Sequence, residues 1–496
     1  PCSATSFSAA GTAVSGRLPS SSTTSSSGCP RTPPWRLISA QAIRAALTIS
    51  CPYKPTRPVK GGIRPKRIGA AIKSPINTDI SNSAGVTFDI DGSLTMIDGK
   101  SITTTGTAIT NIKTTGNIAV SGLVSSSNMI IESSNGAISD NLTGNNANIT
   151  TTSLQITSAN GINLRTNIDT LELSNSLSGD IAIIENDNIT LNQTTIGGID
   201  GAFSLATTGN ITVANIFSNT ASDGDVTLNA TSFINNDFIY IEAGDIEVAT
   251  TNYTQNQDIT TDSGNITITT TNDINQNGDI LASGGNITLA STSGDIVMAD
   301  ATITNLSNYS GSVTYSGENI KLSQLSTDGT VQLVSNGSIT DLSSSETANI
   351  KSNTLNITST NGVGTSLEDV DTDVATLNIN NTTSGDIVIE EKDSLILGTI
   401  TQANGNLVIS NIIDSITQNG SINVSGGFVS ISSADNFVQN GNITLSTASK
   451  TVDVYATSNI TMSSSSITST NEGNVKYETT DTLSLGQINA STADIS

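Results

Sequence analysis

The chain has 496 residues, of which 3% are aromatic and 12% are charged, and it contains no histidine. The lack of histidine excludes the usual Ser–His–Asp and Cys–His catalytic arrangements and removes the commonest general base and metal ligand. The net charge is −24 at pH 7. We therefore expect no nucleic-acid partner and no insertion into a membrane, because an acidic chain repels nucleic acid and anionic bilayers.

Segment 1–78 differs sharply in composition from the rest of the chain. It contains all ten prolines, all three cysteines, 11 of the 19 Lys and Arg residues, and no acidic residue. Residues 79–496 carry 8 basic and 43 acidic groups, a net charge of about −35. This change places a boundary near residue 78. Because the second part contains no cysteine, disulfides do not hold it together.

Segment 1–78 shows no useful periodicity. Its one apolar run, Ile38 to Ile49, contains Gln41 and Arg44 and is too short to span a bilayer. No charged region directly precedes a long apolar stretch, so the segment does not resemble a signal peptide. It is interpreted as a disordered basic arm, a poorly matched targeting extension, or a mistaken gene start read in another frame.

From about Gly116 onward, one short phrase recurs. It consists of Gly, then Asn, Asp or Ser, then Ile or Val, a polar residue and an aliphatic residue. Copies begin at Gly209, Gly224, Gly244, Gly264, Gly285, Gly385 and Gly441. The four copies from Gly224 to Gly285 follow one another at nearly equal intervals of about 20 residues. Intervals of this size are typical of a solenoid.

Each phrase predicts a turn followed by a short strand. Gly followed by Asn or Asp tolerates the left-handed backbone angles of a turn. In the copy at Gly209, Ile211 and Val213 alternate with Thr212, so the two aliphatic side chains point to one side. One such strand cannot bury its inner face alone, whereas stacked coils close a continuous core.

We therefore predict an all-β fold for residues 79–496, a right-handed parallel β-helix (β-solenoid) with about 20 residues per coil. Roughly 20 coils at about 4.8 Å each give a rod on the order of 100 Å long. A β-sandwich array is less favoured because such arrays carry Pro, Tyr and Trp at fixed places. These residues are scarce after residue 78.

A longer repeat overlays the short phrase. The similar segments are residues 154–161 with 355–362, and 171–183 with 377–389. The number of residues that separates the two copies differs between the first pair of segments and the second pair. A few residues were therefore inserted or lost between the two segments of one block. This pattern predicts an internal duplication of a block covering about residues 154–213 and 355–409.

The Gly-Asn-Ile-Thr-Leu phrases, as at Gly285 and Gly441, resemble those of filamentous-haemagglutinin-type adhesins. They and the Ser-Gly-Asp-Ile-Val-Ile phrase from Ser384 also resemble other large Ser/Thr/Asn-rich bacterial β-strand-repeat surface proteins. The resemblance covers roughly residues 80–496. It implies a right-handed parallel β-helix, export across the outer membrane and a role in adhesion or in a biofilm matrix.

The resemblance also implies a location and a kind of partner. The location is extracellular or on the outer cell surface. The partners are glycans or proteins on the surface of a host or neighbouring cell, or further copies of the chain. The family's Asn-Pro-Asn secretion motif and a C-terminal barrel pattern are not found in the sequence, so the chain resembles an interior shaft fragment.

Many β-solenoids act on polysaccharides by gathering carboxylates with Arg, Lys or His on one face. Here the only Arg after residue 78 is Arg165. Two carboxylates suffice for glycoside hydrolysis, and the candidate pairs are Asp180 with Glu185, and Glu390 with Glu391. We interpret these acids as exposed turn and face residues, and we predict no enzymatic activity, no catalytic residue and no cofactor.

The densest acidic run extends from Glu368 to Asp373. Asp369, Asp371 and Asp373 alternate as at the start of a calcium loop. No Gly follows at the required place, however, and no bidentate Glu closes the loop. We therefore predict a solvated loop rather than a specific metal site, with weak calcium binding as a general property of the acidic surface.

Taken together, the residues and the resemblance predict a secreted or cell-surface adhesin-like structural protein that mediates attachment or matrix interaction. A carbohydrate-active β-helix enzyme is one alternative, and it requires carboxylates about 5–10 Å apart in one groove. A self-assembling sheath or surface-layer subunit is the other alternative, and it differs mainly in self-association.

Overall fold

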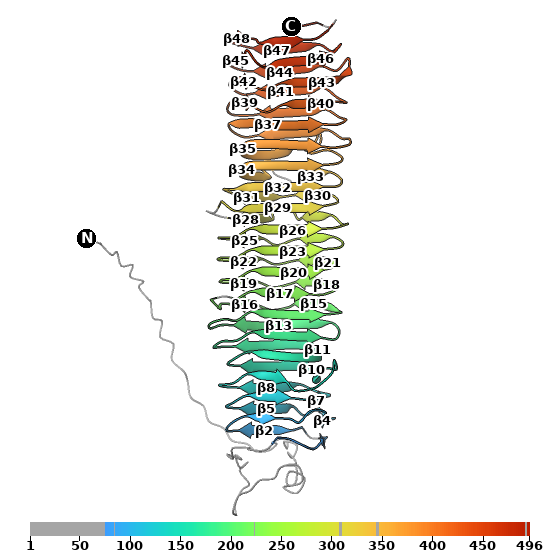
Figure 1. Cartoon of the computed structure of the whole chain (residues 1–496), viewed down its shortest axis with the longest axis vertical. Coiled ribbons are helices and arrows are strands. Elements are labelled where there is room, and N and C mark those ends of the chain that lie inside the picture. The colour runs from blue at the N-terminus through green and yellow to red at the C-terminus, as the bar shows by residue number, and fades with distance from the viewer. Residues whose placement is uncertain (1–74, 84, 223, 307–309, 344–346, 492–493) are drawn as a thin grey trace, which may run out of the picture. The chain divides into compact units, whose positions relative to one another are not determined.

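The computed structural model describes residues 75–496 except for residues 84, 223, 307–309, 344–346 and 492–493. Every regular element in this part of the chain is a β-strand, and the strands pair in parallel. They form a β-solenoid of about 19 turns with about 21 residues per turn (Figure 1). The predicted all-β parallel solenoid is confirmed. The basic segment predicted over residues 1–78 lies, up to residue 74, outside the described residues.

The strands fall into five groups along the chain. The first group is β1 Ile80–Asn82, β2 Thr87–Ile90, β3 Leu94–Thr95, β4 Ser101–Thr104, β5 Thr110–Thr114, β6 Ile118–Val120, β7 Gly122–Ser125, β8 Met129–Ser133 and β9 Ile138–Asp140. A block of four strands follows, β10 Ile149–Ser158, β11 Ile162–Asn175, β12 Ile181–Glu185 and β13 Ile189–Ile196, in which all but β12 are long.

The third group contains only short strands. It comprises β14 Phe203–Thr207, β15 Asn210–Val213, β16 Phe217–Asn219, β17 Val226–Asn229, β18 Ser232–Asn235, β19 Ile239–Ile241, β20 Ile246–Thr250, β21 Asn252–Gln255, β22 Ile259–Thr261, β23 Ile266–Thr270, β24 Ile274–Gln276, β25 Ile280–Ala282, β26 Ile287–Ser291, β27 Ile296–Met298, β28 Ile303–Leu306, β29 Ser312–Gly317, β30 Ile320–Leu322, β31 Gln324–Thr327, β32 Thr330–Ser335 and β33 Ile339–Asp341.

A second block of four strands, in which all but β36 are long, and a second series of short strands complete the solenoid. The four are β34 Ile350–Ser359, β35 Val370–Asn381, β36 Ile387–Glu391 and β37 Leu395–Gln402. The series is β38 Leu407–Asn411, β39 Ile416–Gln418, β40 Ile422–Val424, β41 Val429–Ser433, β42 Phe437–Gln439, β43 Ile443–Ala448, β44 Val452–Ala456, β45 Ile460–Met462, β46 Ile467–Asn471, β47 Val475–Thr479, β48 Leu483–Ser484 and β49 Gln487–Asn489.

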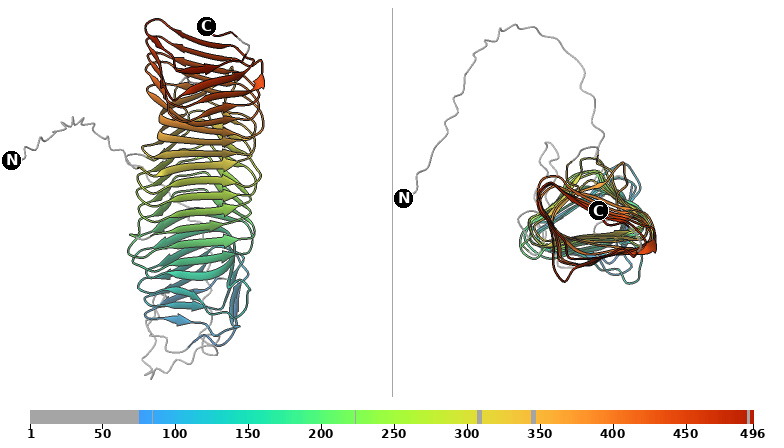
Figure 2. Two further views of the ribbon diagram at one scale, coloured as in Figure 1. Left: turned by 45° about the horizontal axis from the view of Figure 1, so that its top comes forward. Right: turned by 90° about the horizontal axis from the view of Figure 1, so that it is seen from above.

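In the central region each coil contributes one strand to each of three parallel sheets. Strand β17 pairs with β20, β18 with β21 and β19 with β22. The coils therefore lie over one another around a common interior (Figure 2). Along the first of these sheets, Val226, Ile246, Ile266 and Ile287 stack in register, one from each coil. Each of these residues lies two positions after the glycine of one copy of the recurring phrase, so the phrase intervals there equal the coil length.

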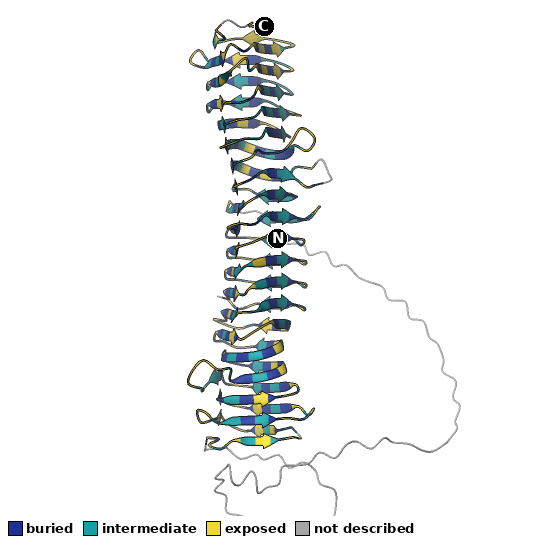
Figure 3. Cartoon of the chain, turned by 90° about the vertical axis from the view of Figure 1, so that its right-hand side faces the viewer, coloured by how far each residue is buried: buried dark blue, intermediate teal, exposed yellow. Residues whose placement is uncertain are grey.

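The core of the solenoid is a set of stacked aliphatic columns. Ile266 and Ile268 are fully buried, and Thr267 between them faces outward and is half-buried. Buried and more exposed residues alternate in the same way in the strands of the stacked coils (Figure 3). Full burial of one Ile side chain stabilises the fold by about 1.5–3 kcal/mol. Because parallel coils repeat this contact, the interior is continuous although it is narrow.

The glycine of the recurring phrase is required by the close approach of successive coils. Gly264 adopts φ +106°, and a Cβ atom there would lie 2.1 Å from the carbonyl oxygen of Gly244. Gly285 has the same relation to Gly264, also at 2.1 Å. The turn column therefore excludes any side chain, for steric as well as conformational reasons.

The Asn or Asp of the phrase links each coil to the next. The Oδ1 atom of Asp225 accepts a hydrogen bond from the N–H of Asp245 at 2.8 Å. Asp245 accepts in turn from Asn265 at 2.7 Å, and Asn265 from Asn286 at 2.9 Å. This ladder gives the turn backbone a partner, which explains why Asn and Asp follow the glycine.

The intervals between glycines of the phrase do not all measure one coil. Gly405 precedes β38, whereas Gly420 precedes β40. These strands belong to different sheets, because β38 pairs with β41 and β40 pairs with β43. The phrase begins strands on more than one side of the solenoid, so its intervals are not always one coil long.

The two sets of longer strands have the same topology. Strand β10 pairs with both β7 and β8, and β34 pairs with both β31 and β32. Each of these long strands therefore runs past the turn that separates two short strands in the preceding coil. After the block the turn returns, because β13 pairs with both β15 and β16, and β37 pairs with both β39 and β40. The strands of the two predicted blocks therefore correspond one to one here.

Candidate functional site

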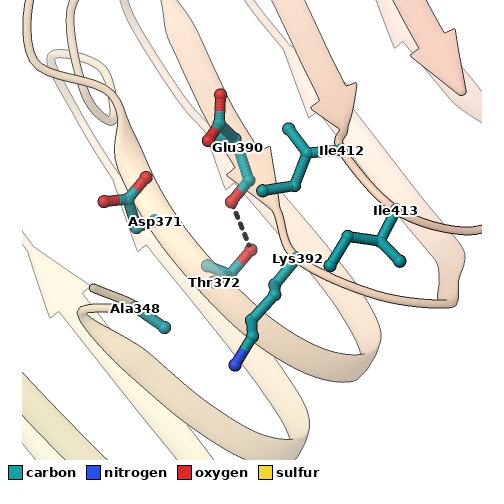
Figure 4. A pocket seen from close by; sticks show the side chains of 7 residues that line it. All are labelled: Ala348, Asp371, Thr372, Glu390, Lys392, Ile412 and Ile413. Atoms are coloured by element: carbon teal, nitrogen blue, oxygen red, sulfur yellow. Dashed lines mark hydrogen bonds between the residues drawn. The ribbon is translucent and has the colours of Figure 1, made fainter. Parts of the chain in front are cut away.

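A shallow groove of about 150 Å³ crosses the second block of long strands. Residues of several successive coils line it, and these are Ala348, Asp371, Thr372, Glu390, Lys392, Ile412 and Ile413 (Figure 4). The groove follows from the register, since Asp371 of β35 lies beside Glu390 of β36. The Thr372 hydroxyl oxygen lies 3.1 Å from the carbonyl oxygen of Glu390.

The groove combines charged and apolar side chains. Asp371 and Glu390 supply carboxylates, and Lys392 supplies an ammonium group (Figure 4). Ile412 and Ile413 are 53% and 63% exposed in the turn that follows β38. Exposed aliphatic side chains rimmed by polar groups are typical of an interaction surface.

Directly behind the groove, the Glu391 side chain points into the solenoid and is fully buried. Its carboxylate accepts hydrogen bonds from the Thr372 hydroxyl at 2.8 Å and from the N–H of Val374 at 3.1 Å. Burial raises the pKa of Glu391 to about 7, and the bond from Thr372 opposes this shift. Glu391 is therefore protonated in a substantial fraction of molecules at neutral pH.

The first block contains the same arrangement. Glu185 is buried, and its carboxylate accepts from the Thr166 hydroxyl at 2.6 Å and from the N–H of Ile168 at 3.2 Å. Burial raises the pKa of Glu185 above its ordinary value, again against the bond from Thr166.

These positions correct the interpretation of the two candidate carboxylate pairs. Glu185 and Glu391 are buried rather than exposed, because each continues the inward alternation of its strand. Asp180 is exposed in the turn before β12, and Glu390 faces the groove. Neighbouring residues of a strand point to opposite faces. Neither pair therefore presents two carboxylates to one exposed surface.

The acidic run from Glu368 to Asp373 is also arranged differently from the prediction. Glu368 and Asp369 are exposed or half-buried before the strand, as expected of a solvated loop, but β35 begins at Val370. Asp371 is buried and Asp373 is half-buried on that strand. The strand begins inside the run because Val370, Thr372 and Val374 supply its buried positions.

Asp373 joins two acids of the following coil. Carboxylate oxygens of Asp373, Glu391 and Asp393 lie within 4.8 Å of one another, and such a set could hold a divalent cation. Lys351 and Lys392 reach Asp373 at 3.4 Å and 3.6 Å, so two ammonium groups already balance part of this charge. The cluster could have been predicted only from the strand register, which determines which residues of successive coils lie side by side.

Arg165, the single Arg after residue 78, lies outside this groove. Its guanidinium donates to Asp140 and to the carbonyl oxygen of Leu142 at 2.6 Å. Both charged side chains are mostly buried, with 18% and 15% of their surface exposed. Arg165 therefore ties the turn after β9 to the later coil of β11 and is occupied by a structural ion pair.

No protein-family model, curated protein or solved structure matches this chain. No helix among the described residues is long and apolar enough to cross a membrane. Hydrogen-bond acceptors, one ammonium group and two exposed aliphatic side chains on a shallow surface suit binding of an extended ligand.

Proposed function

We propose that this chain forms the shaft of a secreted or cell-surface adhesin-like structural protein that mediates attachment or matrix interaction. The observation that carries this proposal is the stack of about 19 coils with one continuous core. Each coil packs mainly on its neighbours, so the rod can be lengthened by adding further coils of the same kind. Such a stack supplies reach of about 90 Å.

The surface composition supports the same role. The residues from 79 onward carry a net charge of about −35, which keeps neighbouring molecules apart and soluble. The shallow groove lined by Asp371, Glu390 and Lys392 suits contact with a ligand chain along the surface. Hydrolysis is less well supported than binding, because the candidate carboxylate pairs do not share an exposed face.

The test combines shape and attachment, both measured on the full chain. Small-angle scattering should give a maximum dimension of at least the length of the solenoid. Beads coated with the protein should be retained on cells or immobilised glycans. Uncoated beads and beads coated with a globular acidic protein are the controls. A compact particle, or retention no greater than the controls, would overturn the proposal.

Electron microscopy of the same preparation tests the sheath alternative. Single rods at micromolar concentration support the shaft. Regular filaments or sheets of the purified chain would replace this proposal with a self-assembling layer, because self-association rather than attachment would then be the main activity.

A further inference from the structure

Two outward-facing aromatic rings lie side by side at the start of β19, far from the groove. Phe238 and Tyr240 flank the inward Ile239, so both rings point outward. Their centroids are 6.4 Å apart and their planes differ by 11°. Phe238 is 38% exposed. Most other aromatic side chains in the described solenoid are buried, and these are Phe203, Phe217, Phe233, Phe437, Tyr253, Tyr315 and Tyr477.

The coils on either side extend this surface. On the preceding coil, Ile216 lies beside Phe238 and is 51% exposed. On the following coil, Asp262 accepts a hydrogen bond from the Tyr240 hydroxyl at 2.8 Å. Glu242 lies two residues beyond Tyr240 on the same face and is exposed. We call Ile216, Phe238, Tyr240, Glu242 and Asp262 the aromatic patch.

The charge around the aromatic patch is entirely negative. The sequence contains no Lys or Arg between Arg165 and Lys321, so no cation of the neighbouring coils can pair with an anionic ligand. Carboxylates accept hydrogen bonds and do not donate them when ionised. The patch is therefore complementary to a ligand that presents hydroxyl donors and no negative charge.

We propose that the aromatic patch binds a neutral oligosaccharide. A pyranose ring has one flat apolar face of C–H groups, which packs on an aromatic ring whose face carries partial negative charge. The Phe238 and Tyr240 rings form a stacked pair with centroids 6.4 Å apart, so a pyranose ring can pack on the exposed surface of this pair. The sugar hydroxyls can then donate to Glu242 and Asp262.

The inference names a ligand class for the proposed attachment role and depends on that role only for its biological meaning. Saccharide binding can be measured in solution whether or not the chain attaches to cells. If the patch binds saccharide but coated beads are not retained, the proposed function fails and this inference stands. If the coated beads are retained but the chain binds no neutral saccharide in solution, the proposed function stands and this inference fails.

The test is affinity electrophoresis of the full chain at about 0.15 M salt, where exposed charges are screened beyond about 8 Å. Separate native gels contain hydroxyethylcellulose, xyloglucan, mannan or the anionic polygalacturonate. We expect retardation by at least one of the three neutral polymers and none by polygalacturonate. Free migration in all three neutral gels, or equal retardation by polygalacturonate, would overturn the proposal.

The variants assign the binding to the two rings. Phe238→Ala and Tyr240→Ala should each weaken binding about 10-fold, and the double variant should abolish it. Phe428→Ala is the matched control, since Phe428 is a similarly exposed ring on another coil, 39% exposed, and it should bind like the wild type. Unchanged binding by the double variant, or an equal loss in Phe428→Ala, refutes the assignment.

A conservative change separates the ring from its hydroxyl group. Tyr240→Phe keeps the stacking surface and removes the bond to Asp262. It should lower the affinity only a few-fold, less than Tyr240→Ala. If Tyr240→Phe loses as much binding as Tyr240→Ala, stacking does not carry the interaction and the proposed mode of binding is wrong.

Discussion

Glu185 and Glu391 belong to different blocks of long strands, yet they occupy the same inner position at the ends of β12 and β36. Each accepts a hydrogen bond from a threonine hydroxyl of the preceding coil and further bonds from main-chain N–H groups. These N–H groups belong to Ile168, Asn186 and Asp187 for Glu185, and to Val374 and Asp393 for Glu391. In most strands the equivalent inward column holds an apolar or small polar residue. These two carboxylates are therefore titratable groups inside the wall of the solenoid, one in each block.

The first prediction concerns the pH dependence of stability at Glu391. Its pKa rises from 4.5 to about 7 on folding, so the folded state holds the proton more tightly than the unfolded state. The resulting stabilisation is present below about pH 4.5 and is lost as the pH rises through about 7. Glu391→Gln should exceed the stability of the wild type only slightly at pH 5 and by up to about 3 kcal/mol at pH 8.

Urea unfolding followed by circular dichroism at pH 5 and pH 8 checks this prediction. Glu185→Gln is the matched variant, and it should show a change of the same sign because burial also raises the pKa of Glu185. A Glu391→Gln variant that is less stable than the wild type at pH 8 would show that the ionised carboxylate is the favoured form.

The second prediction concerns the threonine that supports this carboxylate. Thr372→Val keeps the side-chain shape and removes a hydrogen bond to a buried acid, which costs about 1.5–3 kcal/mol when the acid is ionised. The loss should be larger at pH 8 than at pH 5, because protonation removes the charge. Thr376→Val, at a half-buried position of the same strand, should change the stability by less than about 0.5 kcal/mol. An equal loss of stability in Thr372→Val at both pH values would show that the hydrogen bond from Thr372 does not depend on the ionisation of Glu391.

The alternation in the sequence was sufficient to predict the core and, in principle, the burial of Glu391. Ile387, Ile389 and Glu391 share one parity, and all three are buried. The charge of a glutamate predicts exposure, whereas its position in the alternation predicts burial. The alternation of the strand determines the burial of Glu391, because exposing Glu391 would require a shift of the strand register by one residue. Such a shift would also expose Ile387 and Ile389.

The cluster of Asp373, Glu391 and Asp393 could not be derived from alternation alone. It depends on which residues of successive coils lie side by side, and the step between paired residues differs from coil to coil in the described solenoid. The lengths of the loops determine the number of residues between paired positions, and the recurring phrase does not predict these lengths. The groove was missed for the same reason, since it exists only where several coils meet.

The third prediction concerns the glycine column. Gly264→Ala would place a Cβ 2.1 Å from the carbonyl oxygen of Gly244, and Gly264 also has φ +106°. The coils must separate locally, so we expect a loss of at least about 2–3 kcal/mol. Gly99→Ala is the matched control, because Gly99 has φ +73° but open space around its Cβ position. It should lose only about 1 kcal/mol. Urea unfolding of both variants measures the difference, and equal losses would show that backbone angle rather than coil contact determines the cost.

The fourth prediction concerns a closed triad of hydrogen bonds inside the core. The Tyr315 hydroxyl donates to Gln276 Oε1 at 2.7 Å and lies 2.7 Å from Thr304 Oγ1, while Gln276 Nε2 donates to Thr304 at 2.9 Å. Burial raises the pKa of Tyr315 above its ordinary value, so its hydroxyl stays protonated at neutral pH. The same triad recurs in Gln439, Thr468 and Tyr477.

Tyr315→Phe should cost about 1–3 kcal/mol, because it leaves buried polar atoms of Gln276 and Thr304 short of a partner. The triple variant Tyr315→Phe, Gln276→Met and Thr304→Val should regain most of that loss, since replacing all the partners by apolar groups of similar shape is nearly neutral. Thermal unfolding of the single and triple variants measures both steps. A triple variant that is no more stable than Tyr315→Phe would show that the triad contributes through its own hydrogen bonds. Recovery would instead show that the cost comes from the stranded polar atoms, and Tyr477→Phe should then behave in the same way.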